Sequence, residues 1–246
     1  MKKFLVVATS LVMIITNILA NAVPFNNQTT KQISDSFKVF FVPAGYVFAI
    51  WGVIYLGIIL FNILLLTKKD DSKKLNKVLW AVVISNLANT AWIFLWHYNY
   101  VVLSVVVMLV LLASLIYIYL NLNVRKDLNK NEYLFAKIPF GIYLGWITVA
   151  TVANITVALY SLNWDGFGID GPTWATLLVV VSALLGIIML LRHRDVAYSL
   201  VIIWALMGIA VNFSGLSLLN TVSLGSCLVL SFVVVYTVYK KFLKKA

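Results

Sequence analysis

Residues 100–122 read YVVLSVVVMLVLLASLIYIYLNL, a run without a single Asp, Glu, Lys or Arg. A helix needs roughly 20 predominantly apolar residues to cross a bilayer, because the hydrocarbon core is about 30 Å thick and each residue rises about 1.5 Å. The run is long enough. It also lacks the alternation of polar and apolar residues that strands of a membrane barrel show. The stretch therefore predicts a transmembrane helix.

The rest of the chain repeats this pattern. Of the 246 residues, 63% are hydrophobic and 11% are charged, and the mean hydropathy is +0.99, whereas a soluble domain is about 45–50% apolar and about 25% charged. The connections are short, so consecutive helices are expected to pack antiparallel. We predict an all-α, polytopic membrane bundle of about eight transmembrane helices. The predicted spans are residues 4–22, 43–66, 78–97, 100–122, 138–160, 174–191, 197–216 and 221–239.

The distribution of charge predicts the orientation. If the N-terminus lies inside, eight crossings leave all but two of the 19 basic residues on the inner side, and only Lys31 and Lys38 fall outside. The positive-inside rule favours this arrangement. We therefore predict a multi-pass cell-membrane protein with both termini in the cytoplasm. The net charge of +11 then reflects topology and attraction to membrane lipids, and no nucleic-acid partner is predicted.

The N-terminal segment has a second interpretation. Residues 1–22 combine two lysines, an apolar core and an Ala20-Asn21-Ala22 ending, which is also typical of a secretory signal peptide. We expect the segment to be retained as the first helix. Its cleavage would leave seven spans in the same orientation.

The spans lack the groups that several functions need. All eight acidic residues lie in loops or at helix ends, whereas proton relays and ion-coupled carriers usually keep an ionisable group at membrane depth. The chain has one cysteine and two histidines, which are far apart, so neither a metal site nor a cofactor is predicted. No nucleophile–base pair or carboxylate pair suggests catalysis. Light-driven chemistry of a bound pigment would need none of these groups and stays open.

Aromatic and amide side chains instead recur on one face of each of three spans. Their spacing of three or four residues puts them on a common helix face, and a rise of about 1.5 Å per residue puts them in the middle and outer half of the bundle. Aromatic walls with a few polar groups are typical of small-molecule pockets. The alternative is that each amide joins two helices by a hydrogen bond. The predicted ligand-binding residues are Phe48, Trp51 and Tyr55, Asn89 and Trp92, and Trp146, Ala150 and Asn154.

Two further features concern helix packing. Gly141 and Gly145 form a small-xxx-small pair, which predicts a close helix contact, either within the bundle or in a homodimer. Pro139 predicts the start of the fifth span, since proline costs no hydrogen bond in the first turn of a helix.

Three motifs resemble those of the TspO/MBR family, the tryptophan-rich sensory or translocator proteins. FFVPAGYVFAIWGVIY, residues 40–55, is similar to the family hallmark, with Ala44 and Tyr46 in place of a proline and a tryptophan. Asn89 and Trp92 resemble its Leu-Asn-x-x-Trp element. IPFGIYLGWITVATVAN, residues 138–154, matches the spacing of Trp-x-x-x-Ala-Thr-x-x-Asn.

The resemblance implies a five-helix membrane unit over residues 1–160, followed by a three-helix extension over 161–246. It also implies a pocket near the loop between the first two helices. In members of the family this pocket takes tetrapyrroles, sterol-like lipids or synthetic aromatic compounds, and many members dimerise.

We therefore predict an integral membrane binding protein or sensor for an apolar, planar ligand such as a porphyrin. The alternative is a transporter or permease-like protein for a small neutral or hydrophobic solute.

Overall fold

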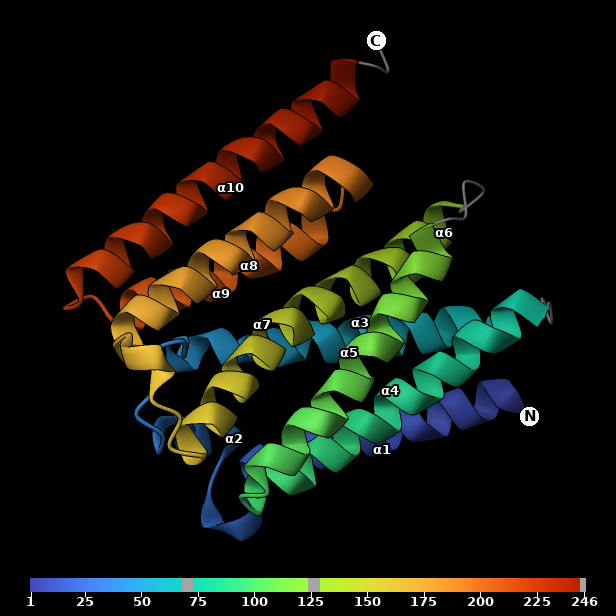
Figure 1. Cartoon of the computed structure of the whole chain (residues 1–246). Helices are drawn as coiled ribbons and strands as arrows, with labels where there is room; N and C mark the ends of the chain where they lie inside the picture. Colours follow the sequence, from blue (N-terminus) through green and yellow to red (C-terminus); the bar gives the residue numbers. More distant parts are fainter. Residues whose placement is uncertain (68–72, 124–128, 244–246) are drawn as a thin grey trace.

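The computed structural model describes residues 1–67, 73–123 and 129–243, and these residues form helices joined by turns (Figure 1). The elements, in chain order, are α1 Lys2–Ala22, η1 Phe25–Asn27, α2 Thr30–Asp35, η2 Gly45–Ala49, α3 Ile50–Thr67, α4 Lys73–His97, α5 Val101–Asn123, α6 Lys130–Glu132, η3 Tyr133–Lys137, α7 Ile138–Ser161, η4 Gly166–Gly168, α8 Gly171–His193, α9 Val196–Asn212 and α10 Ser217–Leu243. The predicted polytopic helical bundle is confirmed.

Seven helices in the described part of the chain are long and apolar enough to cross a membrane. The eighth predicted span, 197–216, is helical only over α9, which has 17 residues and is therefore about 25 Å long. The helix ends at Asn212, whose side-chain Nδ2 donates to the carbonyl oxygen of Val42, 3.0 Å away. A length of 17 residues lies at the lower limit for crossing a bilayer.

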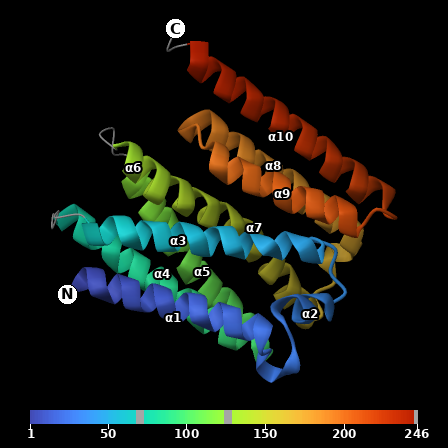
Figure 2. The ribbon, with the colours of Figure 1, turned by 180° about the vertical axis from the view of Figure 1, so that it is seen from behind.

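The helices form two neighbouring groups. α1, α3, α4, α5 and α7 pack together, while α8, α9 and α10 pack on one another and meet the first group mainly where α9 lies against α7. The start of α1 and the end of α10 lie at the same end of the bundle (Figures 1 and 2). This placement agrees with an even number of crossings. The division at residue 160 and the cytoplasmic location of the two ends stay predictions.

The fifth span begins earlier than Pro139 suggested. A continuous apolar helical run extends over Lys130–Ser161, and it contains the π-helical segment Tyr133–Lys137 directly before α7. Proline has no N–H to donate to the preceding turn, and a π-helical turn is one way in which a helix absorbs such a local mismatch. The α-helix itself, α7, begins at Ile138 with Pro139 in its first turn, as the sequence predicted, and the helical residues before it extend the span.

Gly141 and Gly145 lie where α7 meets the start of α9. A Cβ atom built on Gly145 would lie 3.0 Å from the carbonyl oxygen of Tyr198, and one on Gly141 would lie 3.0 Å from Oδ2 of Asp195. These glycines therefore allow two backbones within the chain to approach closely. A homodimer stays a prediction.

Candidate functional site

Six of the eight predicted ligand-binding residues line one cavity between α3, α4 and α7. This cavity, which we call the inner hollow, has a volume of about 50 Å³, far below the roughly 300–1,000 Å³ of a typical small-molecule pocket. The predicted residues on its wall are Phe48, Trp51, Trp92, Trp146, Ala150 and Asn154, and Thr30, Ser34, Pro43, Trp96, Met108, Val149, Ala153 and Val157 complete it. In this conformation the hollow is too small for a fused ring system.

Asn89 lies away from the inner hollow, in a polar contact between three helices. Its Oδ1 accepts a hydrogen bond from Nδ2 of Asn17 on α1 at 2.7 Å, and its Nδ2 donates to the hydroxyl of Tyr143 on α7 at 2.9 Å. Asn89 is completely buried. For this residue the geometry matches the alternative interpretation, in which an amide joins neighbouring helices.

Asn154 lines the inner hollow but already has protein partners. Its Oδ1 accepts from the indole N–H of Trp92 at 2.9 Å and from the hydroxyl of Ser104 at 3.2 Å. Its Nδ2 lies 3.0 Å from the Ser104 oxygen. The amide therefore fixes the Trp92 ring on the wall of the hollow.

The aromatic rings on this wall are in mutual contact. The rings of Trp51 and Tyr55 are stacked, with centroids 5.6 Å apart. Trp146 makes edge-to-face contacts with Phe48 at 5.8 Å and with Trp51 at 6.3 Å. Such pairs contribute about 0.5–1.5 kcal/mol beyond the area that they bury, so the rings fill most of the space that the sequence predicted as a pocket.

Two polar atoms on the wall of the inner hollow have no hydrogen-bond partner among the residues that the structure describes. These atoms are Nε1 of Trp146 and Oγ1 of Thr30, and their side chains belong to residues that are 3% and 5% exposed. A buried donor or acceptor without a partner costs about 1–3 kcal/mol. The hollow therefore offers one N–H donor and one hydroxyl to a guest molecule.

A larger cavity adjoins the inner hollow. It has a volume of about 430 Å³, and we call it the outer cavity; Asn17, Ile18, Asn21, Ala22, Thr30, Phe48, Trp51 and Tyr55 line it. Thr30, Phe48 and Trp51 line both spaces. The predicted Tyr55 lies here, and its hydroxyl makes no hydrogen bond to any described residue. Thr30, Phe48 and Trp51 therefore form the boundary between the two spaces.

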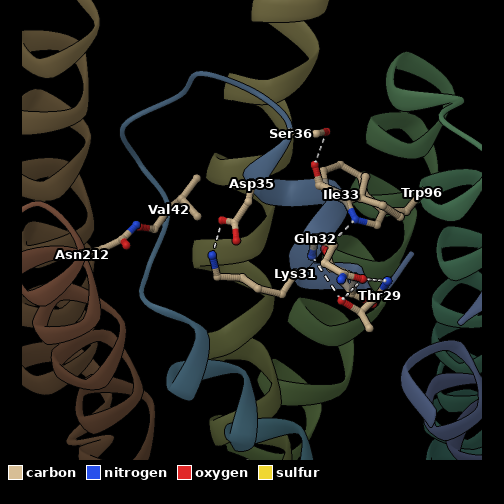
Figure 3. A network of polar contacts seen from close by, with 10 residues as sticks. Thr29, Lys31, Gln32, Ile33, Asp35, Ser36, Val42, Trp96 and Asn212 are labelled. Atoms are coloured by element: carbon tan, nitrogen blue, oxygen red, sulfur yellow. Dashed lines mark hydrogen bonds and ion pairs between the residues drawn. The ribbon is translucent and has the colours of Figure 1, made fainter. Parts of the chain in front are cut away.

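The short helix α2, which Figure 3 shows from close by, contributes Thr30 and Ser34 to the wall of the inner hollow. Its first turn carries a capping box, in which the side chains of Thr29 and Gln32 each accept from the other residue's backbone N–H. Trp96 holds α2 in place, because its Nε1 donates to the carbonyl oxygen of Thr30 at 3.2 Å.

The segment after α2 is also anchored. Figure 3 shows the ion pair between Lys31 and Asp35 and the bond from Ser36 Oγ to the carbonyl oxygen of Ile33, which is 2.7 Å long. Further along, the Asn212 amide donates to the backbone of Val42 (Figure 3). α2 and the segment after it are thus anchored to both helix groups.

Several residues of this site were not predicted from the sequence. Thr30 and Ser34 belong to α2, which the capping-box pattern Thr29-x-x-Gln32 indicates. Asn17 and Trp96 were not among the predicted ligand-binding residues. Trp96 lies four residues after Trp92, on the same helix face, but the contact of its indole N–H with α2 depends on which elements are neighbours.

The site is uncharged. No Asp, Glu, Lys or Arg lines the inner hollow or the outer cavity, and the described residues contain no group of three or more His, Cys, Asp or Glu side chains that could hold a metal ion. The chemistry available is hydrogen bonding from hydroxyl, amide and indole groups, together with aromatic contact. This combination suits recognition of a largely apolar molecule.

A helical bundle with an aromatic hollow between membrane-spanning segments defines a class of polytopic membrane protein with an internal site. The chain belongs to the TSPO-like protein family, whose model matches residues 3–239. The family resemblance seen in the three motifs is thereby confirmed, and the match continues through α8, α9 and nearly all of α10. No curated protein and no solved structure matches the chain. Family membership points to a membrane-embedded binding or sensor protein.

Proposed function

We propose that this protein binds an apolar, planar ligand, such as a tetrapyrrole or a sterol-like lipid, in the joined inner hollow and outer cavity. The observation that carries the proposal is the pair of unsatisfied buried atoms, Trp146 Nε1 and Thr30 Oγ1, on the wall of an otherwise apolar hollow. A buried polar group without a partner destabilises the folded protein. A ligand whose edge carries hydrogen-bonding groups would remove this cost by supplying the partner.

The volumes support entry from the outer cavity. About 430 Å³ lies within the range of small-molecule sites, and its wall contains the stacked rings of Trp51 and Tyr55. In the proposed complex a flat ligand lies against these rings. The Trp51 ring reorients while it stays stacked on the ligand, and the polar edge of the ligand then reaches Thr30 and Trp146.

The contacts that attach α2 and the segment after it to neighbouring helices also favour a binding or sensor role. α2 is attached to α4 through Trp96, and the segment that follows it is attached to α9 through Asn212. Displacement of Trp51 and Thr30 by a ligand would therefore be transmitted to both helix groups. We propose that this coupling is the signal by which ligand binding is sensed.

The proposal is tested by titrating the purified protein with protoporphyrin IX and following the quenching of tryptophan fluorescence. Trp51→Ala removes one stacking partner and is expected to weaken binding by about 2- to 13-fold, because an aromatic pair contributes about 0.5–1.5 kcal/mol. Trp80→Ala is the matched control: it also removes one tryptophan, but Trp80 is 47% exposed and lines neither space.

Equal affinities of the two variants would refute the proposed site. The transporter alternative has a different readout, since it requires exchange of labelled ligand across the membrane of a proteoliposome. Binding without such exchange would support the sensor, whereas exchange that is lost in Trp51→Ala would favour the transporter.

A further inference from the structure

A third cavity opens at the side of the bundle and is separate from the site described above. It has a volume of about 680 Å³ and shares no residue with the inner hollow or the outer cavity. It lies between α3, α7 and α9, where α3 and α9 diverge toward the end of the bundle that carries α6 (Figure 2). We call it the lateral groove. Its wall consists of Ala49, Ile50, Val53, Tyr133, Lys137, Ile138, Ile142, Arg194, Asp195, Val196, Ala197, Leu200, Val201 and Trp204.

The lateral groove has the length of one membrane leaflet. Along α9 it extends from Arg194 to Trp204, a distance of about 15 Å at 1.5 Å per residue, and half of a hydrocarbon core is also about 15 Å. The indole N–H of Trp204 donates to the carbonyl oxygen of Val47 at 3.0 Å. This bond joins α9 to η2 at the end of the groove that lies away from Arg194.

The two ends of the groove differ in polarity. Its charged residues, Lys137, Arg194 and Asp195, all lie at the end near α6 and the turn between α8 and α9 (Figure 1). The remaining wall, apart from Tyr133, is apolar. Val53 and Leu200 are about half exposed, at 51% and 50%, so the apolar part is open to lipid chains.

The charged end is suited to an anion. The Asp195 carboxylate caps α9 by accepting from the backbone N–H of Tyr198 at 2.9 Å. The Lys137 ammonium group lies over the Tyr133 ring, 5.6 Å from its centroid. Arg194 is exposed, and its guanidinium makes no ion pair with any described residue. Two cationic side chains and one carboxylate, which already accepts a hydrogen bond, thus line this end of the groove.

We propose that the lateral groove is a binding site for one anionic phospholipid, with the headgroup phosphate at Lys137 and Arg194 and one acyl chain along α9. Basic pockets between transmembrane helices on the cytoplasmic side recognise acidic lipid headgroups. The apolar length argues for a lipid over a free anion, because an acyl chain that packs along this wall gains van der Waals contacts that a free anion cannot make. The proposal does not depend on the ligand in the inner hollow.

The test measures the lipid retained by the protein. The protein is solubilised from bilayers of equal parts phosphatidylglycerol and phosphatidylcholine, and the lipid that stays bound is quantified by mass spectrometry. Phosphatidylglycerol should be enriched. The double variant Lys137→Gln, Arg194→Gln should lose about 25-fold in this preference, since a basic residue near the membrane surface contributes about 1 kcal/mol, or about fivefold.

The matched control is Lys130→Gln, Arg192→Gln, which removes two basic residues from the same end of the bundle but none from the groove. An equal loss in this control would overturn the proposal, because the preference would then reflect diffuse charge. Competition by inorganic phosphate as effective as that by phosphatidylglycerol would overturn it as well, because the apolar part would then contribute nothing.

A second pair of variants tests the acyl-chain part and does not rely on the charged end. Leu200→Trp places a larger side chain in the lateral groove and should reduce the retained phosphatidylglycerol. Leu184→Trp, on α8, introduces the same side chain at a residue that is 52% exposed and outside the groove. Unchanged retention in Leu200→Trp, with unchanged thermal unfolding in both variants, would overturn the proposal.

Discussion

Trp92 and Trp146 provide a direct comparison, because both line the inner hollow but only one indole N–H has a partner. Nε1 of Trp92 donates to Asn154 at 2.9 Å, whereas Nε1 of Trp146 has no partner in the described part of the chain. The residues are 7% and 3% exposed. Substitution of either by Phe removes the same atoms from a buried position, so the costs of the resulting cavities should be similar.

The difference between the two variants therefore isolates the hydrogen bond. Interhelical hydrogen bonds in a membrane protein contribute about 0.6 kcal/mol on average and about 1.7 kcal/mol at most. Trp92→Phe loses such a bond between α4 and α7, and Trp146→Phe loses none. We expect Trp92→Phe to have the lower free energy of unfolding, by about 0.6–1.7 kcal/mol.

The affinity for protoporphyrin IX should follow the opposite order. Trp146→Phe removes the donor that is available to a ligand, and a net hydrogen bond of about 0.5–1.5 kcal/mol corresponds to a 2- to 13-fold change. Trp92→Phe leaves that donor in place. Both quantities are measured in one detergent, by reversible unfolding in sodium dodecyl sulfate and by fluorescence titration.

Equal destabilisation of the two variants would contradict the reasoning, because it would mean that the Trp146 N–H is bonded in the native protein. Equal loss of affinity would contradict the assignment of Trp146 as a ligand donor. Neither result depends on the absolute stability of the protein.

Three further predictions concern the contacts that hold the bundle together. Asn89→Ala should lower the free energy of unfolding by about 1–3 kcal/mol, because it leaves the Asn17 amide and the Tyr143 hydroxyl without this partner. The control is Asn121→Ala, at an amide that donates within its own helix, and it should have less than half the effect in the same unfolding assay. Gly145→Ala places a Cβ atom 3.0 Å from the Tyr198 carbonyl oxygen and should lower the unfolding midpoint by an amount that corresponds to about 1–3 kcal/mol. At Gly52 a Cβ atom would meet nothing within 4 Å, so Gly52→Ala should leave the unfolding midpoint unchanged or raise it. Asn212→Ala removes the bond to Val42 and should speed amide hydrogen exchange in residues 36–44 while leaving α4 and α7 protected; unchanged exchange there would mean that Asn212 does not anchor the segment.

Much of the site was visible in the sequence as a set of helix faces. Trp51, Trp92, Trp146 and Asn154 lie three or four residues from their neighbours on each stripe, and helical periodicity turns this spacing into a common face. The positions of these residues within charge-free apolar runs predicted how deep in the membrane they lie. Their convergence on one cavity follows from three such faces in a small bundle.

The sequence did not predict whether that cavity is open or filled by side chains. Spacing along a helix says which side chains point inward, but whether the rings enclose space or fill it depends on packing to within about one ångström. The edge-to-face contacts of Trp146 with Phe48 and Trp51 reduce the inner hollow to about 50 Å³. Asn89 lies on the same predicted stripe as Trp92, yet Asn17 and Tyr143 satisfy it.

The sequence by itself determined the class of protein, the positions of most spans and the faces that point inward, because hydrophobicity and helical period are local properties of the chain. Only the tertiary structure decided which polar groups found partners, how far α9 extends, and where α3 and α9 separate to form the lateral groove. Those outcomes depend on contacts between residues that are distant in sequence. For such contacts the free energy is set by the fit of whole helices against one another, which no single segment encodes.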